Sequence, residues 1–288
     1  MKPTRSSRPE SGRDELHESQ TLSGIQGLAE LIPPVLAFGA HPDDIEFACG
    51  GVIAKETRAG RNAHFVVCSR GEAGTHGNPK QRVIEAKRAA ALLGATIEFV
   101  ELDGDAHLEV RASHAIKLAG ILRRVRPSVV LAPSLVENQH PDHFRLGALV
   151  RDTVRLARFG GLRELRQQPR HVVNQLLFYA LSREADPATI QPVFIDVSAP
   201  EVVAIWVAAM EAHASQTGAL QYVEMQLTRA RCHGFSAGVN YATALFPSAP
   251  LLFGSLAQLR GAASAIGIPA AHPGRFHGIE LAKAKGIE

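Results

Sequence analysis

Two short clusters of histidine and aspartate carry the side chains in this sequence that are best suited to bind a metal ion and to move protons. The first cluster is His41-Pro42-Asp43-Asp44, and the second is His140-Pro141-Asp142-His143. Imidazole nitrogens and carboxylate oxygens are common ligands of zinc and of ferrous iron. The two clusters together therefore favour one metal site that is assembled from two loops.

The spacing within the clusters indicates which side chains reach the metal. His41 and Asp44 are three residues apart at the start of a predicted helical turn, so both can point at one cation. A third ligand would come from His143 or from His140, and spacing alone leaves both alternatives open. Two histidines and one carboxylate leave coordination positions free, as in catalytic zinc sites and in the facial triad of ferrous oxygenases.

The remaining polar groups can supply acid–base chemistry beside such a metal. Asp43 is left free to take a proton from the attacking water. From the other loop, His140 could stabilise an oxyanion or protonate a leaving group, with Asp142 orienting its ring. Metal, base and acid are together what the metal-assisted hydrolysis of an amide requires.

The segments around the clusters predict the fold that positions them. Both clusters follow apolar runs with the pattern of buried strands, at 35–39 and 128–132. Further strands are predicted at 63–68, 97–100, 176–181 and 193–197, and helices at 52–59, 81–93, 112–125, 144–157 and 201–214. This alternation predicts an α/β fold, a Rossmann-like doubly wound and mainly parallel sheet with helices on both faces.

The expected strand order gives both clusters the same place in that fold. In the order 3-2-1-4-5, the first and fourth strands are neighbours, and the crevice between their carboxyl ends is the usual ligand site. Either cluster alone could be a turn in which an aspartate caps a helix. Their convergence on one crevice favours the functional interpretation over two separate turns.

Composition sets the class of protein and excludes several functions. The 288 residues are 45% hydrophobic and 20% charged, with a net charge of +3 and no blocks of like charge, so we expect a globular protein that binds no nucleic acid. No apolar run approaches the ~20 residues that cross a bilayer, so no membrane partner is expected. Three scattered cysteines fit a reducing cytosol and a cytoplasmic location. We expect a disordered tail at 1–30, a single domain at 31–270 and a polar tail at 271–288.

The motifs resemble those of the PIG-L/LmbE-like family of zinc-dependent N-deacetylases. The two clusters are similar to the first two family signatures, and the first signature extends through Glu46 to Cys49-Gly50-Gly51. Segment 71–75, followed by Arg82 and Glu85, resembles a block most typical of the branch that acts on N-acetylglucosaminyl-malate in bacillithiol synthesis. Two later segments, 212–216 and 238–242, also resemble family blocks. The resemblance covers residues 35 to 246.

The resemblance implies a role for each matching residue. It implies three zinc ligands: His41, Asp44 and His143. Asp43 would be the general base, and His140 with Asp142 would assist at the oxyanion and the leaving amine. Arg82 falls where the family has a substrate-contacting arginine. The resemblance also implies a homo-oligomer, a trimer or hexamer.

The leading hypothesis is therefore removal of acetyl from an N-acetylglucosaminide, with N-acetylglucosaminyl-malate as the first candidate and another N-acetylated glycoside or amide as the alternative. Six arginines could favour an acidic aglycone, namely Arg151, Arg155, Arg158, Arg163, Arg166 and Arg170. Such residues more commonly form a solvated helix face. Five residues depart from the family pattern at expected pocket walls or subunit contacts: Asn138, Gln139, Trp206, Thr243 and Leu245.

Two rival functions would use the same residues differently. A ferrous oxygenase built on the facial triad explains the ligands but gives no role to Asp43 or His140. A non-catalytic module that binds a sugar or nucleotide is the other rival. No GxGxxG motif follows the first predicted strand, which argues against a dinucleotide.

Overall fold

The computed structural model describes residues 32–137, 140–217 and 221–259. The predicted tails at 1–30 and 271–288 lie outside the described residues, as do the departures from the family pattern at Asn138 and Gln139. Within the described ranges, no helix is both long enough and apolar enough to cross a membrane.

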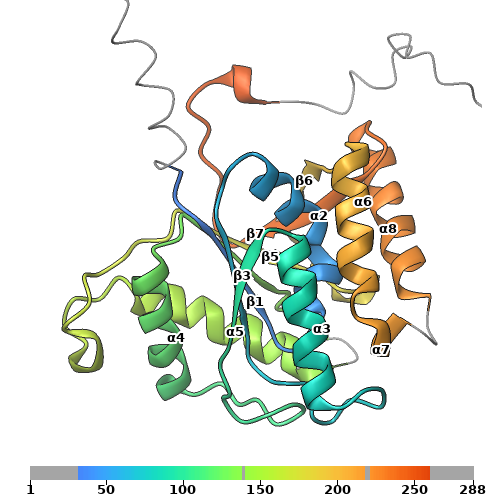
Figure 1. Cartoon of the computed structure of the whole chain (residues 1–288). Helices are drawn as coiled ribbons and strands as arrows, with labels where there is room; N and C mark the ends of the chain where they lie inside the picture. Colours follow the sequence, from blue (N-terminus) through green and yellow to red (C-terminus); the bar gives the residue numbers. More distant parts are fainter. Residues whose placement is uncertain (1–31, 138–139, 218–220, 260–288) are drawn as a thin grey trace, which may run out of the picture.

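Within the described residues, seven strands form one sheet in the order β3-β2-β1-β4-β5-β7-β6 (Figure 1). The strands are β1 (Val35–Gly39), β2 (Ala63–Val67), β3 (Ala95–Phe99), β4 (Val129–Pro133), β5 (Gln175–Tyr179), β6 (Val193–Asp196) and β7 (Ala242–Pro247). Strands β1 to β5 pair in parallel, whereas β7 is antiparallel to both β5 and β6. The predicted order of the first five strands and the α/β class are confirmed. The antiparallel edge is an addition to that prediction.

Helices cover both faces of this sheet (Figure 1). They are α2 (Asp44–Arg58), α3 (Pro79–Leu92), α4 (Ala112–Val125), α5 (Pro141–Leu156), α6 (Pro200–Glu211), α7 (Ala214–Thr217) and α8 (Tyr222–Ala237). Helices α2, α3, α6 and α8 pack into one hydrophobic core, and α4 and α5 pack into a second core on the opposite face. Short 3-10 turns occur at Arg163–Leu165, Arg183–Ala185 and Leu256–Gln258.

The central strand β1 shows why an unbroken apolar run is a good predictor of a buried strand. Val35 and Ala37 belong to one core, and Leu36 and Phe38 belong to the other, because alternate residues of a strand point to opposite faces. All four side chains are buried. A strand that is covered on both faces needs apolar residues at every position.

The helix after β1 begins earlier than predicted. The sequence predicts a helix at 52–59, but α2 begins at Asp44, so the first cluster runs directly into its first turn. Helix α2 is kinked at Cys49, where φ is −139° and ψ is 15°, and Gly50 and Gly51 continue the helix directly after this kink rather than forming a loop before it, although glycine disfavours helix interiors. The structural reason is Trp206 of α6, whose indole packs against both glycines.

The contact with Trp206 predicts the effect of adding one methyl group. A Cβ atom on Gly50 would lie 2.7 Å from Cδ1 of Trp206, which is buried and donates a 2.7 Å hydrogen bond to the Glu46 carbonyl. We expect Gly50→Ala to lower the free energy of unfolding by about 1–3 kcal/mol, measured by urea denaturation. Gly160→Ala is the matched control, because no atom of the described residues lies within 4 Å of its added Cβ. Equal stability of the two variants would contradict the prediction.

Candidate metal centre

The two clusters meet at the carboxyl ends of β1 and β4, which are adjacent and parallel. The first cluster connects β1 to α2, and Asp44 is the first residue of that helix. The second cluster begins with His140, the N-cap residue of α5, and continues into the first turn of the helix. The sheet order therefore brings together side chains that are far apart in the sequence, as the switch-point argument predicts.

Three ligand candidates from these loops have the spacing of a tetrahedral metal site. His143 Nε2 lies 3.2 Å from His41 Nδ1 and 3.1 Å from Asp44 Oδ1. The contact of His41 Nδ1 with Asp44 is to the other carboxylate oxygen, Oδ2, at 3.6 Å. Ligand atoms at about 2.0–2.1 Å from a tetrahedral zinc ion are roughly 3.3 Å from one another. These distances, and the convergence of two imidazole nitrogens with a carboxylate, fit a zinc ion.

Neighbouring groups fix both the orientation and the charge of the Asp44 carboxylate. Its Oδ2 accepts hydrogen bonds from the backbone N–H groups of Ala40 and His41, at 2.8 and 3.0 Å, which leaves Oδ1 directed at His143. Burial raises the pKa of Asp44, but the neighbouring His143 and His41 hold it well below its usual value. The carboxylate is therefore ionised and fixed in orientation.

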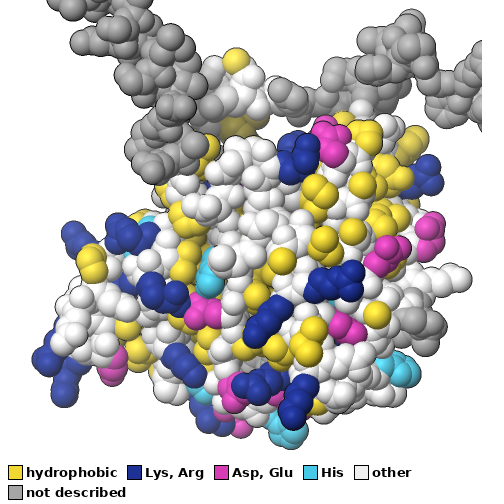
Figure 2. Space-filling view, viewed as in Figure 1, with side chains coloured by type: hydrophobic (Ala, Val, Ile, Leu, Met, Phe, Trp, Pro, Cys, Tyr) yellow, Lys and Arg dark blue, Asp and Glu magenta, His cyan; other side chains and the backbone are white. Residues whose placement is uncertain are grey.

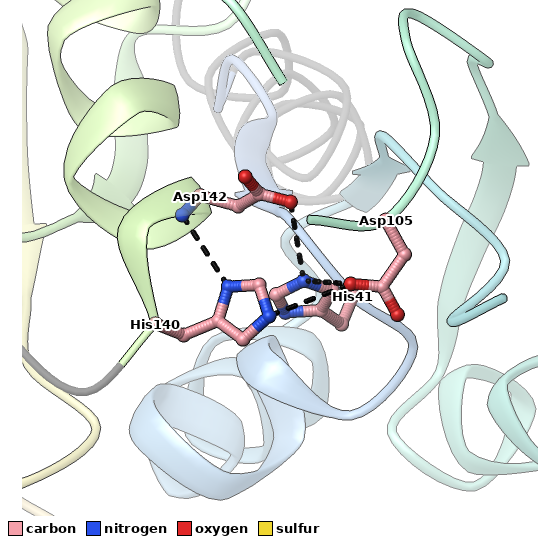
Figure 3. A group of neighbouring side chains, drawn as sticks. All are labelled: His41, Asp105, His140 and Asp142. Carbon is pink, nitrogen blue, oxygen red and sulfur yellow. Dashed lines mark hydrogen bonds and ion pairs between the residues drawn. The ribbon is translucent and has the colours of Figure 1, made fainter. Parts of the chain in front are cut away.

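The second nitrogen of His41 faces two other carboxylates (Figure 3). Nε2 lies 3.1 Å from Asp105 Oδ1 and 3.6 Å from Asp142 Oδ2. A carboxylate on one ring nitrogen favours the tautomer that leaves the other nitrogen free for a metal. Burial lowers the pKa of His41, but Asp44, Asp105 and Asp142 raise it well above its usual value.

A second set of side chains also has metal-ligand spacing: His41, Asp105, His140 and Asp142 (Figure 3). The two sets share His41, but the second would use its Nε2 atom. All three ligand candidates of the first set line an open cavity, whereas Asp142 is buried and does not. A catalytic metal must be open to water and substrate, so the first set is the better candidate and the second set orients it.

Asp43 lines the cavity together with the triad and has an unusual backbone conformation. Its φ angle is 126°, a region that side chains other than glycine rarely adopt. Strained residues of this kind concentrate at functional sites. Burial and the adjacent Asp44 raise the pKa of Asp43 to about 6, against the lowering effect of Arg82. Asp43 lines the cavity beside the metal candidates.

Arg82 holds Asp43 and the loop after β2 together. Its buried guanidinium donates to Asp43 Oδ2 at 3.2 Å, to the Pro42 carbonyl at 3.1 Å and to the Gly71 carbonyl at 3.3 Å. Gly71 has a positive φ, and a Cβ atom there would lie 2.1 Å from Arg82 Nη1. Arg82 also lines the cavity, so the substrate contact predicted from the resemblance stays a prediction.

The cavity above the triad has a volume of about 360 Å³, the size of a small-ligand site. Its inner end contains the metal candidates, Asp43, Asp105 and His140. Its other walls come from α2, the loop after β2, the segment after β5, α7 and α8: Phe47, Ala73, Gly74, Thr75, Leu181, Ser182, Gln216, Tyr222, Met225 and Gln226.

Two groups of residues predicted at the pocket lie elsewhere. Trp206, Thr243 and Leu245, three of the departures from the family pattern, are buried and do not line this cavity. The prediction that they form pocket walls is therefore wrong. The six arginines between 151 and 170 do not line it either, because they belong to the second half of α5 and the segment that follows.

Asp105 is the site residue that the sequence analysis missed. It lies in the loop after β3, which is two strands away from β1, and yet its buried carboxylate contacts both His41 and His140. Burial raises the pKa of Asp105, but hydrogen bonds from these two histidines hold it well below its usual value. The available signal was an acidic Asp-Gly-Asp turn directly after a predicted strand, at the same edge of the sheet.

The segment 212–216 contacts the two helices α2 and α3 beside the site. His213 Nε2 lies 3.5 Å from Glu46 Oε1, and both residues are buried. Ser215 donates from its hydroxyl to Glu85 Oε2 at 2.5 Å and from its backbone N–H to Oε1 at 3.0 Å. These contacts join the start of α7 to α2 and α3.

Comparisons with known proteins agree with this fold and site. Residues 36–154, which contain both clusters, match the PIG-L family, described as GlcNAc-PI de-N-acetylase. The chain is 27% identical over 249 residues to the diacetylchitobiose deacetylase of Thermococcus kodakarensis, covering 75% of this chain and 85% of that protein. It is 34% identical over 120 residues to the 4-oxalmesaconate hydratase of Pseudomonas putida, covering 38% of this chain and 46% of the hydratase.

A solved structure extends the similarity over most of the chain. The conserved protein TT1542 from Thermus thermophilus aligns with a TM-score of 0.67 and 31% identity, covering 77% of this chain and 97% of that one. The similarity therefore reaches well beyond the two clusters. On this evidence the chain belongs to the PIG-L family.

Proposed function

We propose that this protein is a zinc-dependent hydrolase that removes the acetyl group from an N-acetylglucosaminide. The observation that carries the proposal is the triad of His41, Asp44 and His143, with the spacing of a tetrahedral zinc site, opening into a cavity beside the unligated carboxylate of Asp43. When bound, zinc would lower the pKa of the attacking water and polarise the amide carbonyl.

The surrounding side chains supply the proton transfers. Asp43 takes a proton from the attacking water, because Arg82 fixes one of its oxygens, Oδ2, and leaves the other for that task. His140 accepts a hydrogen bond on Nδ1 from the Asp142 backbone N–H, so its proton lies on Nε2. His140 also lines the cavity, and we assign its Nε2–H to stabilise the oxyanion beside the leaving amine. The proton that Asp43 takes from the water then passes to the leaving amine, which restores the Asp43 carboxylate. Asp142 and Asp105 orient the two histidines.

Two kinds of evidence support an N-acetylglucosaminide as the substrate class. The segment 71–75 with Arg82 and Glu85 supports N-acetylglucosaminyl-malate, the substrate of the bacillithiol branch. The similarity to the diacetylchitobiose deacetylase of Thermococcus kodakarensis supports a chitobiose-type substrate. Both compounds place the same N-acetyl group on a glucosamine ring and differ only in the aglycone. The homo-oligomer and the cytoplasmic location expected from the sequence remain predictions.

A hydratase is the second candidate function. The 34% identity to a hydratase favours it, although that match covers less than half of either protein. Hydration and deacetylation both begin with an activated water, so the metal site alone does not separate them. The products do, since only deacetylation releases acetate. A ferrous oxygenase is weaker because it would use neither Asp43 nor His140, and a non-catalytic module would have no need of the strained Asp43.

A substitution of Arg82 tests whether this residue positions Asp43, the proposed general base. We expect Arg82→Lys to lower kcat by between about 10-fold and 100-fold with little change in KM, because a single ammonium cannot hold Asp43, Pro42 and Gly71 in the same geometry. Arg88→Lys, an exposed position on the same helix, is the matched control. A higher KM with unchanged kcat would show instead that Arg82 only contacts the substrate.

The assay for the proposed function measures free amine from a panel of N-acetylglucosaminides with the zinc-loaded protein. The panel contains N-acetylglucosaminyl-malate, N,N'-diacetylchitobiose and methyl N-acetylglucosaminide. We expect amine release from at least one of them, with loss of release after chelation and recovery with zinc. No release from any of them at full metal occupancy would contradict the proposal.

A further inference from the structure

We propose that the outer part of the cavity binds an uncharged, hydroxyl-bearing aglycone, such as a second sugar, and discriminates against an aglycone that carries carboxylates. The inference rests on the proposed function, because the acetamide group must lie at the triad for the aglycone to reach the outer walls. The outer part consists of the segment after β5, α7 and the first turns of α8: Leu181, Ser182, Gln216, Tyr222, Met225 and Gln226.

Charge is the first argument. Among the described residues that line the cavity, Arg82 is the only lysine or arginine, and its guanidinium already donates to three oxygens. The inner wall carries three aspartates, at 43, 44 and 105. A carboxylate that enters the outer part would lose hydration without meeting a cation, which disfavours its binding.

The arginines that suggested an acidic aglycone lie too far from the metal site to contact the substrate, in the second half of α5 and in the segment that follows it. Helix α5 begins at the metal site and runs away from it, and Arg155 lies twelve residues beyond His143. At 1.5 Å per residue this is about 18 Å along the helix axis. Figure 2 shows dark-blue side chains over the segment that follows α5, on the part of the surface that Figure 1 places away from α7 and α8. Five of these six arginines are exposed to solvent and one, Arg151, is half-buried, so they form mainly a solvated surface away from the cavity.

Two glutamines determine which polar groups the outer part presents. Gln216 Nε2 donates to the His76 carbonyl at 2.8 Å and to Ser215 Oγ at 3.1 Å. Gln226 Nε2 donates to the Leu181 carbonyl at 2.8 Å. A backbone carbonyl can only accept, so these contacts fix both amides with the nitrogen on the protein side. Each amide oxygen is then directed away from these contacts, where it can accept from a ligand hydroxyl but would repel a carboxylate. The hydroxyls of Ser182 and Tyr222 in the same wall can both donate and accept.

An aromatic ring completes the outer part. Tyr222 is 37% exposed, and its ring meets Phe47 in an edge-to-face contact with centroids 5.7 Å apart. Met225 lies one turn further along α8 and is also exposed. Rigid aromatic and thioether surfaces beside hydrogen-bond acceptors suit the apolar face of a sugar ring and its hydroxyl rim.

The test compares aglycones on the zinc-loaded full chain. We expect kcat/KM for N,N'-diacetylchitobiose to be at least tenfold higher than kcat/KM for N-acetylglucosaminyl-malate. It should exceed kcat/KM for methyl N-acetylglucosaminide by a similar factor. Equal or faster turnover of the malate compound would overturn the inference and leave the deacetylase proposal intact. No amine release from any of the three would overturn the deacetylase proposal and this inference with it.

A charge introduced at Met225 tests the same point within one protein. We expect Met225→Arg to raise the ratio of malate to chitobiose turnover at least tenfold. Leu252→Arg, which places the same charge at an exposed position that does not line the cavity, is the matched control and should leave that ratio unchanged. Tyr222→Ala should raise KM for the disaccharide and leave KM for the methyl glycoside unchanged. An unchanged ratio in Met225→Arg, with normal folding by circular dichroism, would overturn the assignment of this wall to the aglycone.

Discussion

Asp43→Asn is expected to lower kcat by about 100-fold or more while the protein keeps its metal. The amide has almost the same shape as the carboxylate but no basic oxygen, so the proton of the attacking water has no acceptor at this position. Asparagine also tolerates a positive φ better than most residues, so the strained backbone at this position should persist. Turnover and bound zinc are measured on the same sample.

The matched control for this variant is Asp152→Asn. Asp152 lies on α5, and its side chain is partly exposed and contacts the side chain of Arg155. We expect turnover within error of the parent protein. Unchanged turnover in Asp43→Asn would contradict the assignment of the general base, and loss of zinc together with turnover would make Asp43 part of the metal site.

His143→Ala and Asp44→Ala are expected to lose both zinc and all measurable turnover, but they should differ in stability. Removal of Asp44 leaves the buried N–H groups of Ala40 and His41 without their acceptor, at a cost of about 1–3 kcal/mol each. The contacts of the His143 imidazole are instead with the side chains of His41 and Asp44, so its loss should cost less. Metal analysis and urea denaturation measure the two effects separately.

A second pair of variants decides which of the two sets of ligand candidates binds the metal. Asp105 and Asp142 contact His41 through Nε2, on the side of the ring away from the triad. We expect Asp105→Asn and Asp142→Asn to keep zinc with weaker affinity, about 10-fold to 100-fold. If Asp105→Asn and Asp142→Asn lost zinc completely while His143→Ala retained it, the metal would be bound by the second set, His41, Asp105, His140 and Asp142.

The sequence predicted well where the two clusters lie in the fold, because each short motif follows a buried strand. Both clusters lie at the ends of adjacent parallel strands, and β1 and β4 are recognisable because strands covered on both faces are apolar at every position. Asp105 could not be placed in this way. Its loop follows an edge strand, and its contact with His41 depends on the path of residues 100–111 across the sheet end, which no local pattern encodes.

The prediction was weakest where tertiary packing overrides local preference. Gly50 and Gly51 disfavour a helix, but the indole of Trp206 needs the space that they leave. The C-terminal elements α8 and β7 were not predicted from the sequence. The first turns of α8 contribute Tyr222, Met225 and Gln226 to the cavity wall and pack Val223 and Leu227 against the core, so no single apolar stripe marks this helix. The specificity of the outer cavity therefore depends on the part of the chain that was hardest to predict.

The most direct test of the central claim measures acetate and free amine from N,N'-diacetylchitobiose against bound zinc in the same preparation. We predict equal amounts of acetate and amine, a rate proportional to zinc occupancy, and loss of that rate in Asp43→Asn at unchanged occupancy. Absence of acetate from all three N-acetylglucosaminides at full occupancy, together with water addition to 4-oxalmesaconate, would contradict the account and make the protein a hydratase.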